Sequence, residues 1–132
     1  MIEAVPIFDV QSNSGYESNI SSVEFKNQSL TIVVDFDYGE EYEITFNEQV
    51  WAFRYMEEGD LRYYWESGEF KSGHLIYEIL KGGWLSKEGS EKDILGIARS
   101  ENWLKEWFVV TKNFSFVVLS NSLPFISRLQ NA

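Results

Sequence analysis

Five carboxylates lie close together in the first half of the chain, and no lysine or arginine occurs between Lys26 and Arg54. They are Asp35, Asp37, Glu40, Glu41 and Glu43. Carboxylates in such a group can ligate a hard cation, act as general acid and base, or attract a cationic partner. A calcium loop takes its ligands from an irregular segment, whereas these residues follow a strand pattern. The pattern therefore favours an electrostatic binding face over a metal site or a catalytic pair.

The segment that must position these carboxylates is 29–46, which predicts two strands joined by a tight turn at 37–40. Apolar residues alternate along both strands and should share one buried face: Leu30, Ile32, Val34, Phe36, Tyr42, Ile44 and Phe46. The same alternation should place Asp35, Asp37, Glu41 and Glu43 together on the opposite face, with Glu40 near the turn.

Aromatic residues form a second candidate surface. The chain has 5 Trp, 7 Tyr and 10 Phe, and six aromatic side chains lie in two predicted strands at 50–57 and 61–66. Two neighbouring strands cannot bury all of them, and exposed tyrosines beside acids are typical of protein-binding surfaces. We therefore expect Tyr55 and Tyr64 to contribute to binding.

Other chemistry has little support in the sequence. The chain has no cysteine and one histidine, His74, which is too little for a transition-metal site. No nucleophile or phosphate-binding motif surrounds His74 or the glycine pairs. The sequence predicts a protein that is not an enzyme, with no catalytic residues, no metal and no cofactor.

Charge limits the classes of partner. The formal net charge is −10, and residues 1–66 hold 14 acidic and 3 basic side chains, against 7 and 8 in residues 67–132. This asymmetry disfavours nucleic acids and anionic membranes, and it favours a basic protein partner. The absence of cysteine, of a leader-like start and of a long apolar run favours a cytoplasmic protein.

A chain of this length predicts one domain over residues 1–132. We expect a β-dominant α+β fold with one or two short helices. Its main element is a twisted antiparallel sheet of about seven or eight strands, which can curve into a half-barrel. Strands are predicted at 1–10, 23–26, 29–46 (as a hairpin), 50–57, 61–66, 74–80, 107–111 and 114–120. A loop is predicted at 11–22, a short helix at 100–106, and helical turns at 84–89 and 125–129. A strand is favoured over a helix at 74–80, and 93–99 fits either.

The second half of the chain resembles small uncharacterised bacterial proteins, some of which sit among polymorphic-toxin immunity proteins. The resemblance covers roughly residues 50–127 and lies in strand order and in a few Trp, Ser and Pro positions. The segments that carry it are 98–104 (ARSENWL), 107–111 (WFVVT), 117–120 (VVLS) and 123–126 (LPFI). It includes no catalytic motif, and it implies a cytosolic bacterial protein with toxin neutralisation as a candidate function.

Two functions follow from these observations. The first is a non-enzymatic protein-binding module, in its most concrete form an immunity-type inhibitor that covers a basic toxin with its acidic face. The alternative is a small-ligand-binding domain with an aromatic pocket between sheet and helix. A flat acidic face with exposed aromatics would favour the first, and a deep pocket with clustered polar groups the second.

Overall fold

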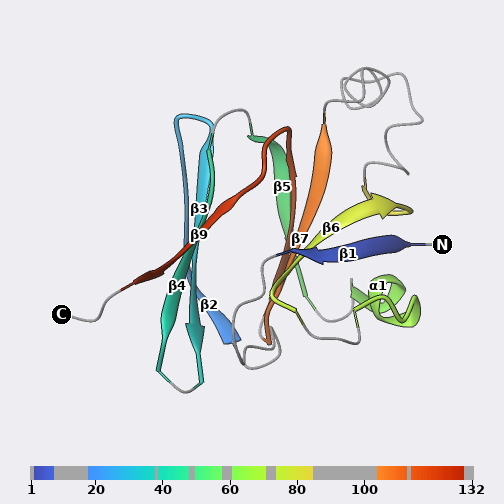
Figure 1. The fold of residues 1–132 in the computed structure, drawn as a ribbon, viewed down its shortest axis with the longest axis horizontal. Helices are drawn as coiled ribbons and strands as arrows, with labels where there is room; N and C mark the ends of the chain where they lie inside the picture. The colour runs from blue at the N-terminus through green and yellow to red at the C-terminus, as the bar shows by residue number, and fades with distance from the viewer. Residues whose placement is uncertain are drawn as a thin grey trace.

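The computed structural model describes residues 2–7, 18–37, 39–47, 50–57, 61–70, 74–84, 104–112 and 114–129. Within these residues the chain forms nine β-strands and one short helix (Figure 1). All strand pairings are antiparallel, and the strands belong to two sheets that stack face to face. The described part is therefore a β-sandwich.

Sheet A has five strands in the order β1-β6-β7-β8-β5. Their bounds are β1 (Glu3–Ile7), β6 (Ile76–Lys81), β7 (Lys105–Val110), β8 (Ser115–Ser120) and β5 (Val50–Met56). The hairpin of β7 and β8 lies inside the sheet and is buried almost throughout, which explains why its strands are apolar at consecutive positions. Pro6 lies in the edge strand β1. Proline has no backbone N–H to donate, and an edge strand tolerates this because it pairs on one side only.

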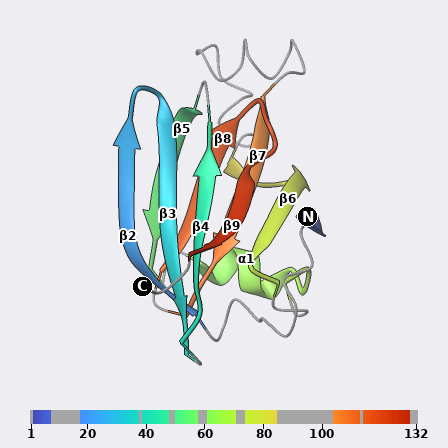
Figure 2. The same cartoon turned by 60° about the vertical axis from the view of Figure 1, so that its left-hand side comes forward.

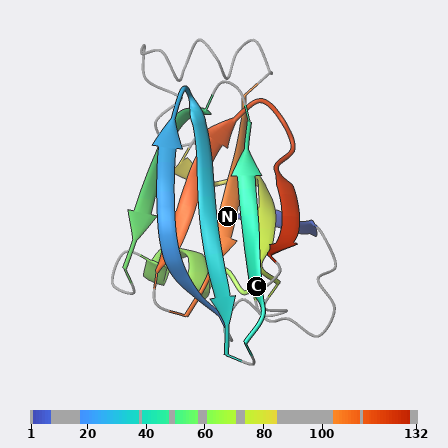
Figure 3. The same cartoon turned by 90° about the vertical axis from the view of Figure 1, so that its left-hand side faces the viewer.

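Sheet B has four strands in the order β2-β3-β4-β9. Their bounds are β2 (Ser18–Lys26), β3 (Ser29–Phe36), β4 (Glu41–Phe46) and β9 (Phe125–Leu129). Asn27 and Gln28 join β2 to β3 with φ values of 52° and 64°, as a two-residue turn of type I′ requires. Figures 2 and 3 show that the edge strands β2 of sheet B and β5 of sheet A run beside each other along one side of the sandwich.

The interior between the sheets is built from alternate residues of both. Sheet B contributes the apolar face of its hairpin, and sheet A contributes the side chains of β6, β7 and β8 that point toward sheet B. These buried residues are Leu30, Ile32, Val34, Phe36, Ile44, Phe46, Val50, Leu75, Ile76, Trp107, Val109, Phe116 and Val118. All the apolar hairpin residues expected to be buried are in or against this core, with Tyr42 half-buried, so the predicted register is confirmed.

The opposite face of sheet A is also buried, and we call it the covered face. It presents Tyr77, Ile79, Phe108, Val110 and Val117. Helix α1 (Arg62–Glu66) and the residues around it pack on this face with Leu61, Tyr64 and Phe70, all buried. Sheet A is therefore the middle layer of three.

Several predictions from the sequence are confirmed in this architecture. The protein is β-dominant and antiparallel, residues 76–81 form a strand, and the 107–120 region forms a central hairpin. The single sheet of seven or eight strands is wrong, because β5 leaves β4 and joins the other sheet beside β8. Two stacked open sheets replace the rolled sheet.

Three local predictions are also corrected. The predicted strand at 61–66 is helix α1, because Leu61 and Tyr64 lie three residues apart and both reach the covered face. The predicted helical turn at 125–129 is β9, which pairs with β4 and brings Ile126 opposite Ile44. The predicted loop at 11–22 includes the first residues of β2.

The helix predicted at 100–106 is wrong at its end, since Lys105 and Glu106 belong to β7. Of the helical turn predicted at 84–89 only Trp84 is described, and the segment 93–99, for which the sequence predicts a strand or a helix, lies outside the described residues. Within the described ranges, no helix combines the length and the apolar character needed to cross a membrane.

Candidate functional site

Three of the five predicted carboxylates share the surface of sheet B that faces away from sheet A, here called the outer face of sheet B. They are Asp35, Glu41 and Glu43, each half-buried. Asp35 lies directly opposite Glu41 across β3 and β4, and Glu43 lies opposite Val33. Like charges in facing positions repel, so this arrangement costs stability.

No lysine or arginine of the described chain forms an ion pair with these three carboxylates. Their neighbours on the flanking strands are uncharged, since Asn19 faces Asp35 from β2 and Ser127 faces Glu43 from β9. Thr45 donates a hydrogen bond to Glu43 Oε1 at 3.4 Å. The part of the outer face of sheet B around these three carboxylates therefore keeps its negative charge.

The other two carboxylates lie elsewhere and are paired with cations from the second half of the chain. Asp37 follows the end of β3, and Lys112 Nζ lies 2.9 and 3.0 Å from its two oxygens. Arg128 Nη2 lies 3.4 Å from Glu40 Oε1, while the Tyr42 hydroxyl donates to Glu40 Oε2 at 3.0 Å. The expectation that Asp37 shares the face of Asp35, Glu41 and Glu43 is thus corrected, because Asp37 lies beyond Phe36, the last residue of β3, and pairs with Lys112, which follows β7 of sheet A.

Tyr55 belongs to a group of exposed or half-buried apolar side chains along the side where β2 and β5 meet. We call this group the aromatic seam, and it comprises Val23, Phe25, Phe53, Tyr55 and Phe114. The Phe25 and Phe53 rings lie 5.2 Å apart across the two sheets, and Tyr55 meets Phe114 edge-on at 5.5 Å. Phe25 is 49% exposed and Tyr55 57% exposed, so apolar side chains from the inward faces of both sheets reach solvent along this side.

Tyr64 is not on this surface. It is 4% exposed, lies on α1, and packs against Phe108 with ring centroids 4.8 Å apart. Burial, aided by the Glu106 carboxylate, raises the pKa of Tyr64 to about 12, although a hydrogen bond with Arg54 opposes the shift. The prediction that Tyr64 belongs to the exposed aromatic surface is wrong, because helix formation turns it onto the covered face of sheet A.

A buried carboxylate that sequence reasoning missed lies at the edge of the covered face. Glu106 is 2% exposed, and its Oε2 accepts a hydrogen bond from the backbone N–H of Trp84 at 3.0 Å. A Cβ atom added at Gly83 would clash with that oxygen and lie 2.8 Å from Ile79 Cγ2, so any other residue there would have to displace its neighbours. Arg54 stacks over the Trp84 ring at 4.5 Å. The sequence does contain a sign of this site, because Glu106 alternates with Phe108 and Val110 and so shares their face of the strand. The helix predicted at 100–106 placed Glu106 outside the strand, so the alternation was missed.

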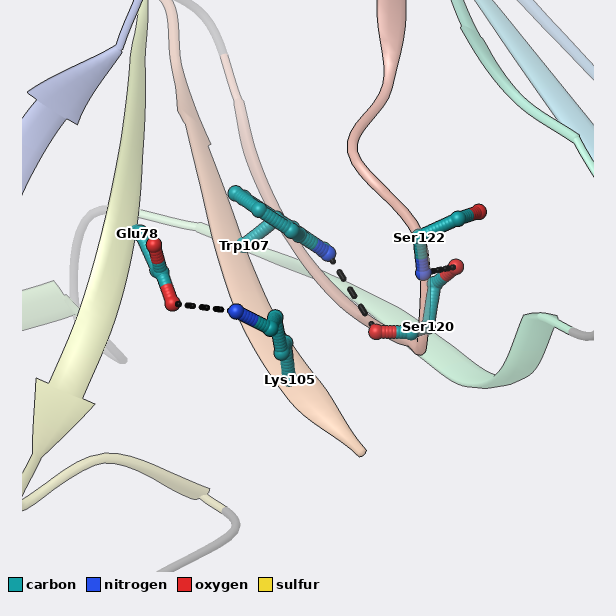
Figure 4. A network of polar contacts seen from close by, with 5 residues as sticks. All are labelled: Glu78, Lys105, Trp107, Ser120 and Ser122. Atoms are coloured by element: carbon teal, nitrogen blue, oxygen red, sulfur yellow. Dashed lines mark hydrogen bonds and ion pairs between the residues drawn. The ribbon is translucent and has the colours of Figure 1, made fainter. Parts of the chain in front are cut away.

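The side of the interior away from the seam has polar contacts near the start of β7 (Figure 4). Lys105 Nζ lies 3.7 Å from Glu78 Oε2 on the neighbouring strand β6. The Trp107 indole N–H donates to the Ser120 carbonyl at 3.4 Å, and the Ser122 N–H donates to Ser120 Oγ at 3.4 Å. This side is therefore held by ion-pair and hydrogen-bond contacts, whereas the seam consists of apolar side chains, with ring contacts between its aromatic members.

His74 is half-buried, and its ring lies edge-on to Tyr77 at 5.9 Å. Its backbone N–H donates to the Tyr77 hydroxyl at 2.9 Å. Among the described residues, no group of three or more His, Asp or Glu side chains is placed to hold a metal ion.

Comparison of the chain with models of known protein families, with curated protein sequences and with solved structures finds no match.

Proposed function

We propose that this protein is a non-enzymatic protein-binding module that recognises a basic protein partner, and that it acts as an immunity-type inhibitor of a toxin. The observation that carries the proposal is the unpaired charge of Asp35, Glu41 and Glu43 on the outer face of sheet B. Opposing Asp35 to Glu41 weakens the fold, and a cationic partner would relieve that repulsion.

The physical role of such a face is to speed encounter. A negative field attracts a basic surface over about 10 Å at 0.1 M salt and orients it before contact. Asp37 and Glu40 contribute less to this field, because Lys112 and Arg128 neutralise them. The binding surface therefore centres on β3 and β4, with Tyr55 on the neighbouring side of the sandwich as an aromatic contact.

The test uses the wild-type protein and a triple variant, Asp35→Asn, Glu41→Gln and Glu43→Gln, which keeps side-chain shape while removing three charges. Both serve as baits for proteins of the cells that make this chain. The association rate of the retained partner is then measured by surface capture at several salt concentrations. We expect slower association and a weaker salt dependence for the triple variant.

A matched control removes three exposed carboxylates from elsewhere on the described chain, at Glu57, Glu66 and Glu69. Equal slowing in both variants would assign the effect to net charge and contradict a dedicated face. For the inhibitor role, co-expression of the wild-type protein should relieve the growth arrest that the partner causes, and the triple variant should relieve it less.

A further inference from the structure

The edge of sheet B at β2 has the geometry of a strand-addition site. Ser21 to Lys26 are all exposed, and among the described strands none pairs with this edge. Lys26 and Ser29 close the two-residue turn as a hydrogen-bonded pair, so every second residue from Lys26 points its backbone groups at β3. The N–H and C=O groups of Val23 and Phe25 therefore point away from the sheet.

This edge is held in place at both ends by sheet A. The Val50 N–H donates to the Gln28 carbonyl at 3.1 Å, at the turn that follows β2. The Lys112 N–H donates to the Ser18 carbonyl at 2.8 Å, at the start of β2. An edge fixed in advance loses little conformational entropy when a partner binds, which favours affinity.

The aromatic seam lies beside this edge. Val23 and Phe25 belong to the face of β2 that points toward sheet A, and Phe53 and Tyr55 belong to the face of β5 that points toward sheet B. Figures 2 and 3 show β2 and β5 adjacent along this side of the sandwich. A strand placed next to β2 would lay every second side chain on the seam and exclude water from it.

We propose that an extended segment of the partner, with apolar and basic side chains alternating, adds to β2 as a fifth strand of sheet B. Its apolar side chains cover the aromatic seam. Its basic side chains lie on the outer face of sheet B, where β2 presents Glu24 and, next to the turn, Lys26, and where β3 presents Asp35. The basic character of the segment rests on the proposed function, whereas strand addition rests on the β2 edge and the seam.

Charge selects this occupant over a second copy of the chain. Each copy carries a formal net charge of −10, and a second copy would bring like charges together. Among the described residues, the other edge of sheet B, at β9, has no comparable seam. Its exposed aromatic residue, Phe125, is opposite Thr45 and so points to the outer face.

The experiment selects binders to the wild-type protein from a displayed library of short random peptides. The affinity of the selected peptides is measured for the wild type and for Phe25→Ser, Val23→Pro and Phe125→Ser. Proline at position 23 removes an N–H that points away from β3, so the ladder within sheet B stays complete. Phe125→Ser is the matched control, because it removes an exposed aromatic ring from the opposite edge of the same sheet.

We expect the selected peptides to alternate apolar and basic residues and to bind Phe25→Ser and Val23→Pro about tenfold or more weakly. Binding to Phe125→Ser should be unchanged, and bound peptide should slow amide exchange at Val23 and Phe25. Melting curves check each fold. If Phe25→Ser or Val23→Pro lowers the melting temperature strongly, Tyr55→Ser takes its place, because Tyr55 belongs to the seam but lies on β5 rather than β2.

Binding that both seam variants leave unchanged would overturn strand addition and leave the acidic face untouched. A concentration-dependent dimer of the wild type that Phe25→Ser abolishes would also overturn it, by assigning the edge to a second copy. Selected peptides that need the seam but are neutral or acidic would overturn the basic chemistry of the occupant, and with it the proposed function.

Discussion

The covered face of sheet A and the outer face of sheet B both lie outside the sandwich interior, and they have opposite chemistry. The covered face carries Phe108, Val110 and Val117, which are fully buried beneath α1 and its neighbours. The outer face of sheet B carries Asp35, Glu41 and Glu43 with no cation beside them in the described chain. The comparison separates a surface that holds the fold together from one that the fold tolerates at a cost.

The largest difference between the two faces should appear when an aromatic ring is removed from the covered face. Phe108 is fully buried and touches the rings of Tyr64 and Phe70. We expect Phe108→Ala to lower the free energy of unfolding by about 3–5 kcal/mol, through lost burial and the cavity left behind. Denaturant unfolding measures the change.

A matched pair of valines from central strands sharpens this test. Val117 lies on the covered face, and Val33 lies half-buried on the outer face of sheet B. Val117→Ala should cost on the order of 2 kcal/mol and Val33→Ala clearly less, because less apolar surface returns to water. Equal losses would mean that the two faces contribute equally to stability.

The pH dependence of stability offers the next contrast, because only the covered face buries a tyrosine. The folded state holds the pKa of Tyr64 at about 12, above its ordinary value of 10.0. Below pH 10 the group is protonated in both states. As pH rises from 10 to 12 the unfolded chain releases this proton first, so stability falls by up to about 1.4 kcal/mol per pH unit.

The control for this prediction is Tyr64→Phe. Across this alkaline range the unfolding midpoint of the wild type should fall more steeply with rising pH than that of the variant, and the phenolate absorbance of the wild type should contain one late-titrating tyrosine that the variant lacks. Parallel midpoint curves would contradict a raised pKa at Tyr64.

An effect of similar size is expected at the buried carboxylate. Gly83→Ala would press Cβ against Glu106 Oε2 and within 2.8 Å of Ile79 Cγ2. We expect a loss of about 1–3 kcal/mol, because the carboxylate is fixed by the Trp84 N–H and cannot retreat freely. In a double-mutant cycle, Glu106→Ala removes the clash, so the two losses should sum to more than the loss of the double variant. Simple additivity would count against this contact.

The smallest effect should come from the outer face of sheet B. The triple variant Asp35→Asn, Glu41→Gln and Glu43→Gln relieves repulsion, so its free energy of unfolding should rise by roughly 0.2–1 kcal/mol or stay unchanged. Its melting temperature, compared with the wild type at low and high salt, measures this. A marked fall in melting temperature would show that these carboxylates stabilise the fold, and the contrast between the two faces would fail.

Local patterns in the sequence predicted most strands and the register of the β3–β4 hairpin. The alternation from Leu30 to Phe46 fixes which side chains are buried, because successive strand residues point to opposite faces. The runs Val109-Val110 and Val117-Val118-Leu119 marked strands covered on both faces, since no polar alternation is left where water is excluded from both sides. Alternation likewise placed Asp35, Glu41 and Glu43 on one face.

Only the tertiary structure decided how these pieces combine. Leu61 to Trp65 fits a period of two as well as a helical turn, and packing on sheet A selected the helix and buried Tyr64. Lys112 and Arg128 reach Asp37 and Glu40 from far along the chain, so no local pattern could show which carboxylates are neutralised. The division into two sheets depends on β5 pairing with β8, and that choice also brings β2 and β5 together and creates the aromatic seam. Such contacts join residues distant in sequence, and their energies come from the burial and charge of the assembled fold.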